Sequence, residues 1–198
     1  MLISHKYKAI FCPIPKTAGT SISNILKQHE FIDFNLNQEK DKSIDDITGK
    51  YKIGTARRAK RGISDNIWNE YFKFAFVRNP YDRAISNFFF LSYDKRMTFS
   101  EFINTTFILS HDIWHFELSQ STHIYDDNNN LMIDFIGRFE SLQDDFNYIC
   151  DKINIKRTIL PVANKSKASY INKNDLLTTD NKIFIYNKYK DDFINFNY

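Results

Sequence analysis

Seven residues near the amino terminus, Pro15 to Ser21, combine a cation, a glycine and small hydroxyl side chains. An apolar run at residues 9–12 precedes them, and apolar residues recur at helical spacing over residues 22–26. The segment is therefore predicted to join a buried strand to a helix. The first turn of a helix leaves N–H groups unpaired and carries the positive end of the dipole. With Lys16 adding a full charge, these residues predict a phosphate-binding loop.

A second strand–turn–helix pattern also places a cation at the end of a strand. Residues 71–77 form an aromatic and β-branched run that is typical of a core strand, and Arg78 follows it. Asn79 is a good helix N-cap and Pro80 suits the first helical position, so a helix is predicted to continue over residues 81–91. A guanidinium can hold a phosphate through two parallel hydrogen bonds. The pattern predicts a second anion site.

The order of residues in the loop argues against a Walker A motif, G-x-x-x-x-G-K-[ST], in which Lys follows Gly. Here Lys16 precedes Gly19. No Walker-type carboxylate stands out at the end of a predicted strand, which disfavours a magnesium nucleotide. The loop is predicted to bind phosphate without a required metal.

Several segments, in chain order, resemble the PAPS-dependent sulfotransferases, in particular the carbohydrate branch and its bacterial relatives. P-K-T-A-G-T-S at residues 15–21 is similar to the 5′-phosphosulfate loop of that family. F-K-F-A-F-V-R-N-P-Y-D-R-A-I-S-N-F at residues 72–88 is similar to its 3′-phosphate motif. Counterparts also exist for residues 134–146, 164–166 and 189–193.

The resemblance implies that the co-substrate is PAPS (3′-phosphoadenosine 5′-phosphosulfate), with Arg78 and Ser86 gripping its 3′-phosphate. Lys16 would neutralise the charge that builds on the leaving 5′-phosphate oxygen. Sulfuryl transfer would then be an in-line displacement catalysed by positioning and charge stabilisation. The predicted PAPS-binding residues are Lys16, Thr17, Ala18, Gly19, Thr20, Ser21, Arg78 and Ser86.

The general base is where this chain departs from the family. Many relatives carry a His shortly before the segment that matches Thr55 and Ala56, and here Gly54 and Thr55 stand in that place. We predict that His115, in a Trp-containing segment, is the second catalytic residue beside Lys16. The other candidates for the base are His111, Asp112, Glu117 and Asp33. Gln120 and Ser121 resemble a Gln-Ser pair that lies near the substrate in the family, which favours this region as facing the acceptor.

Alternating predicted strands and helices indicate an α/β chain. We expect one sulfotransferase domain over residues 1–198, a three-layer P-loop-like fold with a central parallel sheet flanked by helices. A third strand is predicted at residues 131–137. One helix is predicted at residues 98–107. A second is predicted to begin at a capping box that starts at Ser141. A final helix is predicted from Thr178 or Asp180 to the carboxyl-terminal end of the chain. Predicted helix caps are Thr20 or Ser21 for the first helix and Thr98 or Ser100 for the helix at 98–107.

The charge balance, 27 basic against 24 acidic residues, gives a net charge of +3 and does not indicate nucleic-acid binding. One local cluster is basic, and it reads either as a solvated helix face or as a contact surface for an anionic ligand. Its members are Arg57, Arg58, Lys60 and Arg61.

Cys12 and Cys150 are predicted to be buried, inert thiols. No stretch approaches the ~20 apolar residues of a membrane span, and no signal peptide is recognised, so a cytoplasmic protein is expected.

The sequence thus predicts an enzyme that moves a sulfuryl group from PAPS to a hydroxyl of a small-molecule or glycan acceptor, most simply a carbohydrate. Two alternatives stay open. One is a small-molecule kinase that uses the loop at Lys16 for ATP. The other is a catalytically degenerate family member that still binds PAPS or PAP, the desulfated product.

Overall fold

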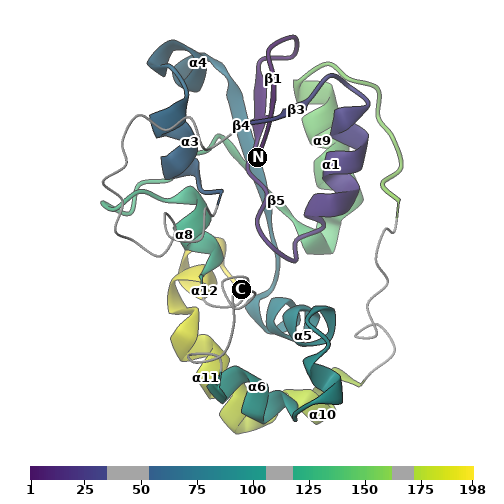
Figure 1. Cartoon of the computed structure of the whole chain (residues 1–198), viewed down its shortest axis with the longest axis vertical. Coiled ribbons are helices and arrows are strands. Elements are labelled where there is room, and N and C mark those ends of the chain that lie inside the picture. Colours follow the sequence, from purple (N-terminus) through teal and green to yellow (C-terminus); the bar gives the residue numbers. More distant parts are fainter. Residues whose placement is uncertain (35–53, 106–117, 162–171) are drawn as a thin grey trace. The chain divides into compact units, whose positions relative to one another are not determined.

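A computed structural model describes residues 1–34, 54–105, 118–161 and 172–198 (Figure 1). The chain forms two compact units. Unit 1 comprises residues 1–77 and 122–161, and unit 2 comprises residues 78–121 and 162–198. Among the described residues, no helix is both long and apolar enough to cross a membrane.

Unit 1 is built on a five-stranded sheet of order β3-β1-β2-β4-β5. The strands are β1 (Leu2–Ser4), β2 (Ala9–Phe11), β3 (Ile32–Asp33), β4 (Phe72–Val77) and β5 (Phe135–Arg138). β2, β4 and β5 pair in parallel, whereas β1 pairs antiparallel with β2 and with β3. The predicted parallel centre is therefore confirmed, and the antiparallel edge is an addition that the sequence pattern did not predict.

The third strand starts later in the chain than its apolar pattern predicts. Leu131 makes only an isolated antiparallel bridge with Tyr125, and the parallel ladder begins at Phe135. Asp134 explains the boundary, because its carboxylate accepts the Lys73 amide at 2.7 Å while its own amide donates to the Lys73 carbonyl at 2.8 Å. A side chain thus replaces one rung of the ladder just before the strand starts.

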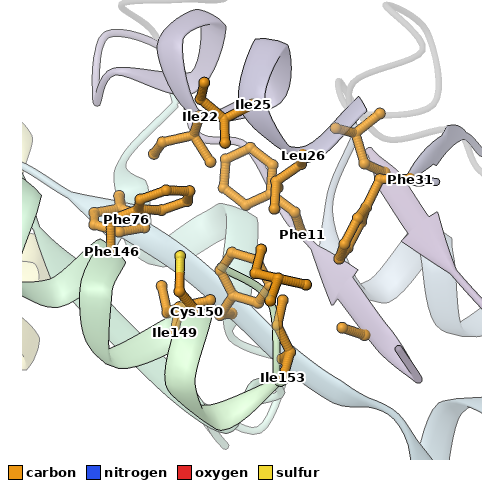
Figure 2. Packing of buried hydrophobic residues seen from close by; sticks show 14 of the residues in the cluster. Phe11, Ile22, Ile25, Leu26, Phe31, Phe76, Phe146, Ile149, Cys150 and Ile153 are labelled. Atoms are coloured by element: carbon orange, nitrogen blue, oxygen red, sulfur yellow. The ribbon is translucent and has the colours of Figure 1, made fainter. Parts of the chain in front are cut away.

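Helices cover both faces of this sheet. Figure 2 shows Phe11 and Phe76 of the strands packed against α1 (Gly19–Lys27) and α9 (Leu142–Lys152). Ile22 and Leu26 of α1 and Phe146 of α9 are fully buried there. The opposite face meets α3 (Ala56–Gly62) and α4 (Asp65–Glu70), as Figure 1 shows. This arrangement agrees with the predicted α/β class.

Two predicted helix starts differ in detail. α1 begins at Gly19 behind the N-cap Ala18, so neither Thr20 nor Ser21 caps it. The left-handed backbone at Ala18 starts the helix earlier than the hydroxyl residues suggest. α9 does follow Ser141, but the Ser141 hydroxyl donates to Asp145 at 2.7 Å instead of capping the helix.

Unit 2 is helical in the residues described. Its elements are α5 (Pro80–Phe90), the 3₁₀ turn η2 (Tyr93–Lys95), α6 (Phe99–Thr105), α10 (Lys173–Leu176), α11 (Thr179–Lys188) and α12 (Lys190–Phe196). The short helix α8 (Gln120–Ile124) begins in unit 2 and ends in unit 1. The single final helix that the pattern predicts is in fact two. Tyr189, which is 1% exposed, separates α11 from α12.

The predicted caps of unit 2 are confirmed. The Asn79 side chain accepts the Tyr81 amide at 3.0 Å, and Pro80 occupies the first turn of α5. At α6, the Thr98 hydroxyl accepts the Glu101 amide at 3.2 Å, and the Glu101 carboxylate accepts the Thr98 amide at 2.7 Å. This reciprocal pair is a capping box.

Gly137 of β5 provides a test of the packing between neighbouring strands. A Cβ at Gly137 would lie 2.5 Å from the Phe76 ring. We therefore expect Gly137→Ala to lower the free energy of unfolding by about 1–3 kcal/mol, the usual cost of overpacking a core. Urea denaturation of both proteins measures the difference.

Gly19→Ala is the matched control, because a Cβ there would meet the nearest atom, Pro13 Cβ, at an ordinary 3.6 Å. Equal stability of Gly137→Ala and the wild-type protein would contradict the close approach of β4 and β5.

Candidate functional site

The loop between β2 and α1 has an unusual backbone. Lys16 and Ala18 both have left-handed conformations, with φ of 69° and 68°. For residues with a Cβ this conformation costs about 1–2 kcal/mol each. Such strain persists only where the surrounding structure enforces it, and it clusters at functional sites. Six other non-glycine residues of the described chain are left-handed as well, but each of them is isolated, whereas this loop has two within three residues. The backbone therefore supports the candidate site together with the sequence of the loop.

Thr17 lies between the two left-handed residues and ties the loop together. Its side chain is fully buried, and its hydroxyl donates to the Ile14 carbonyl at 2.9 Å. The predicted contribution of Thr17 to anion binding is thus limited to its backbone N–H, because its hydroxyl already has a partner inside the loop.

The amino end of α1 suits an anion. Its N-cap residue, Ala18, has no polar side chain to satisfy the N–H groups of the first turn. Thr20 is exposed and Ser21 is 7% exposed, both within that turn, while Lys16 and Gly19 are half-buried. Turns that aim successive N–H groups at one point form anion-binding concavities. Every loop residue predicted to bind PAPS therefore belongs to one continuous turn and helix start.

Cys12 lies between β2 and the loop and takes no part in this chemistry. Its amide donates to the Phe74 carbonyl at 2.8 Å, which extends the pairing with β4 by one residue. Burial raises the pKa of the Cys12 thiol to about 12, so the group stays protonated at neutral pH. Cys150 is buried too, as predicted, and burial also raises the pKa of its thiol.

The second predicted pair lies in unit 2. Arg78 directly follows β4 in the chain and is half-buried, and Ser86 lies in the middle of α5 with 5% of its surface exposed. The main chain of Arg78 is held by the Gln120 side chain, which accepts the Arg78 amide at 2.8 Å and donates to the Arg78 carbonyl at 2.8 Å. The position of the arginine backbone is thereby fixed.

Asp192 of α12 is a residue that the sequence pattern does not single out. It is fully buried and accepts hydrogen bonds from the amides of Gln120 and Ser121, at 2.8 and 2.7 Å. Burial raises the pKa of the Asp192 carboxyl, while the Arg83 guanidinium and the hydrogen bonds oppose that shift. The signal available in the sequence is the acidic pair 191–192 at the start of an amphipathic helix, which an exposed face explains equally well.

Gln120 and Ser121 do not face an open space. They are 0% and 5% exposed and are bonded to Asp192, while residues 106–117 of the region expected to face the acceptor lie outside the described residues. Their side chains serve the internal structure of unit 2.

The candidates for the general base are largely outside the described residues. His115, His111, Asp112 and Glu117 all belong to residues 106–117. Asp33 is described, and it forms an exposed ion pair with Lys27 at 2.7 Å. His123 is a further histidine of interest, because its Nδ1 lies 3.5 Å from the Gly54 carbonyl oxygen and its side chain is 2% exposed.

The predicted basic cluster is not one surface. Arg58 of α3 is 4% exposed, and its amide donates to the N-cap Thr55. Arg57 forms an ion pair with Asp127, whereas Lys60 and Arg61 are exposed. Only part of the cluster can therefore contact a ligand.

One cavity of about 610 Å³ lies in unit 2, beside η2, α6 and α11. Charged residues of both signs line it, among them Arg96, Glu101 and Asp175, but it contains neither Arg78 nor Ser86.

Within the described ranges, no group of three or more His, Cys, Asp or Glu is placed to hold a metal ion.

Comparison with known proteins gives the family. No curated protein and no solved structure matches the chain. The model of the sulfotransferase family matches residues 1–198, the whole of the sequence given. The loop at Lys16 and the motif at Arg78 lie inside that match. The chain therefore belongs to the sulfotransferase family.

Proposed function

We propose that this sulfotransferase takes its sulfuryl group from PAPS and transfers it to a hydroxyl of a carbohydrate acceptor. The observation that carries the proposal is the loop of residues 15–18, where Lys16 and Ala18 are both held in the left-handed conformation directly before α1. A strained turn that ends in the amino terminus of a helix fits a phosphate group.

The two ends of PAPS are assigned to different residues. Backbone N–H groups from Thr17 to Ser21, with the hydroxyls of Thr20 and Ser21, bind the 5′-phosphate in this proposal. Arg78 and Ser86 bind the 3′-phosphate, for which a guanidinium offers paired donors. The resemblance of residues 15–21 and 72–88 to the family motifs supports both assignments.

The chemistry asked of the chain is mainly electrostatic. PAPS supplies an activated sulfuryl group whose transfer leaves a phosphate oxygen with additional negative charge. Lys16 places a cation beside that oxygen, and the N–H groups of α1 add the positive end of the helix dipole. A general base takes the proton of the acceptor hydroxyl. The support for a carbohydrate as acceptor is the resemblance of the motifs to the carbohydrate branch.

Replacing Lys16 and replacing Arg78 are expected to have different effects on turnover and on PAP binding. Lys16→Ala should lower kcat for sulfate transfer about 10²- to 10³-fold, a larger effect than its effect on PAP affinity, because the lysine stabilises charge that develops on the leaving phosphate in the transition state. Arg78→Ala should weaken PAP binding by ~1.5–3 kcal/mol, the scale of a hydrogen bond to a charged group. Calorimetry with PAP and a transfer assay with labelled PAPS and a panel of glycans measure the two effects.

Lys152→Ala and Arg157→Ala are the matched controls, since both side chains are exposed, Lys152 at the end of α9 and Arg157 shortly after it. Negligible effects of both Lys16→Ala and Arg78→Ala on binding and turnover would refute the site.

We propose His115 as the general base, with His123 as the second candidate. The observation that favours His123 is its contact with Gly54, in the segment where many relatives carry a histidine. A carbonyl oxygen only accepts hydrogen bonds, so a hydrogen bond at this contact would place the ring proton on Nδ1.

We expect His115→Asn to lower kcat about 10²- to 10⁴-fold and to remove the acidic limb of the pH–rate profile. His123→Asn should retain that limb. His29→Asn, at a half-buried surface position, controls for the loss of an imidazole elsewhere. If the limb disappears in a folded His123→Asn protein and remains in His115→Asn, His123 is the base.

A further inference from the structure

A side chain, and not the sheet, holds the backbone of Arg78. The last ladder pair of β4 is Val77 with Arg138, and α5 starts at Pro80. Arg78 therefore lies in a junction of two residues between a strand and a helix. The Gln120 side chain supplies both an acceptor and a donor there, each at 2.8 Å, which imitates a further strand residue.

Gln120 is itself fixed from the carboxyl-terminal helix α12. One oxygen of Asp192 accepts the Gln120 amide at 2.8 Å and lies 3.4 Å from Gln120 Nε2. The other oxygen accepts the Ser121 amide at 2.7 Å and the Ser121 hydroxyl at 2.9 Å. The contact with Nε2 favours the orientation of the Gln120 amide in which Oε1 faces the Arg78 amide, and the other contacts hold the main chain of residues 120 and 121 in place.

The Asp192 carboxylate needs its partners, because burying a charged group is costly. A buried carboxylate is tolerated only when it is paired and hydrogen-bonded. Asp192 is fully buried, and Arg83, which is 1% exposed, is the cation that acts on it. Arg83 is held in turn by the Leu118 carbonyl at 3.0 Å and by the Tyr189 ring at 5.6 Å.

We propose that Asp192 and Gln120 are positioning residues that set the affinity of this enzyme for the 3′-phosphate of PAPS by fixing the main chain of Arg78. We refer to Asp192, Gln120 and the main chain of Arg78 as the clamp. The inference rests on the proposed function, because it takes Arg78 as the ligand of the 3′-phosphate. It adds that two residues outside the phosphate-binding motif, 42 positions and more from Arg78, control that contact.

The physical reason is preorganisation. An arginine side chain has several rotatable bonds, and it holds a phosphate with two hydrogen bonds only when its backbone presents it in one direction. If the junction at Arg78 could move, part of the binding free energy would be lost in ordering it. The clamp removes that freedom before the ligand arrives.

A double-mutant cycle tests the clamp. Gln120→Met keeps the length of the side chain but can neither accept from nor donate to Arg78. It should weaken PAP binding about tenfold in the wild-type background, the scale of one hydrogen bond to a charged group, and have no effect in the Arg78→Ala background. Binding of 5′-AMP, which lacks the 3′-phosphate, should be unchanged in every variant.

Asp192→Asn tests the part of the clamp that Asp192 supplies. It places an NH₂ group against donors and should lower PAP affinity about tenfold as well, again without effect on 5′-AMP. Asp191→Asn is the matched control, because it removes the same charge from the adjacent, exposed position of α12. Equal losses for PAP and 5′-AMP, or a loss that persists in the Arg78→Ala background, would show a general structural role and overturn the proposal.

A measurement without substitutions covers the case in which a variant does not fold. The Arg78 amide of the wild-type protein should be protected from hydrogen exchange, and exchange at the rate of an exposed amide would overturn the clamp. The same PAP-binding measurements distinguish a failure of the proposed function from a failure of the clamp. If the wild-type protein binds no PAP, both proposals fall, whereas tight PAP binding that Gln120→Met leaves unchanged removes the clamp alone.

Discussion

The parallel pairing of β2 with β4 is the constraint on which the candidate loop depends. Phe11 pairs with Phe74 in the ladder, and the Cys12 amide continues it by donating to the Phe74 carbonyl. Both phenylalanines are fully buried, and their rings stack at 5.3 Å between centroids. The end of β2 therefore cannot move without opening the core of unit 1. Residues 13–18 must turn from this fixed point into α1, whose Ile22 and Leu26 are anchored in the same core.

These two anchors explain how the loop can hold Lys16 and Ala18 in the left-handed conformation. The strain of a few kcal/mol is small beside the stabilisation that β2 and α1 gain by burying apolar surface together. A relaxed loop would point the N–H groups of its residues in different directions. The strain is thus consistent with a turn selected for binding an anion, and the family match over residues 1–198 gives that turn a chemical context.

The sequence is most informative where local signals and burial agree. The apolar runs at β2 and β4 predict the parallel centre, and Asn79 with Pro80 predicts the start of α5. The order of Lys16 and Gly19 along the chain is enough to distinguish the loop from a Walker motif. Much of the candidate site is therefore predictable, because its residues lie in short segments whose patterns are local.

Other features could not be predicted because they depend on residues far apart in the chain. β1 and β3 are three and two residues long, too short for a periodic pattern. A left-handed backbone at Lys16 has no glycine to signal it. Asp192 bonds to Gln120 across 72 positions, and one acidic pair gives no sign of which member is buried.

The measurement that tests the central claim most directly is calorimetry of the wild-type protein with PAP, and with ADP and ATP in the presence of magnesium. A sulfotransferase that uses PAPS must bind PAP far more tightly than either nucleotide, because only PAP carries the 3′-phosphate assigned to Arg78 and Ser86. Tighter binding of ATP with magnesium than of PAP would contradict the account and favour a kinase.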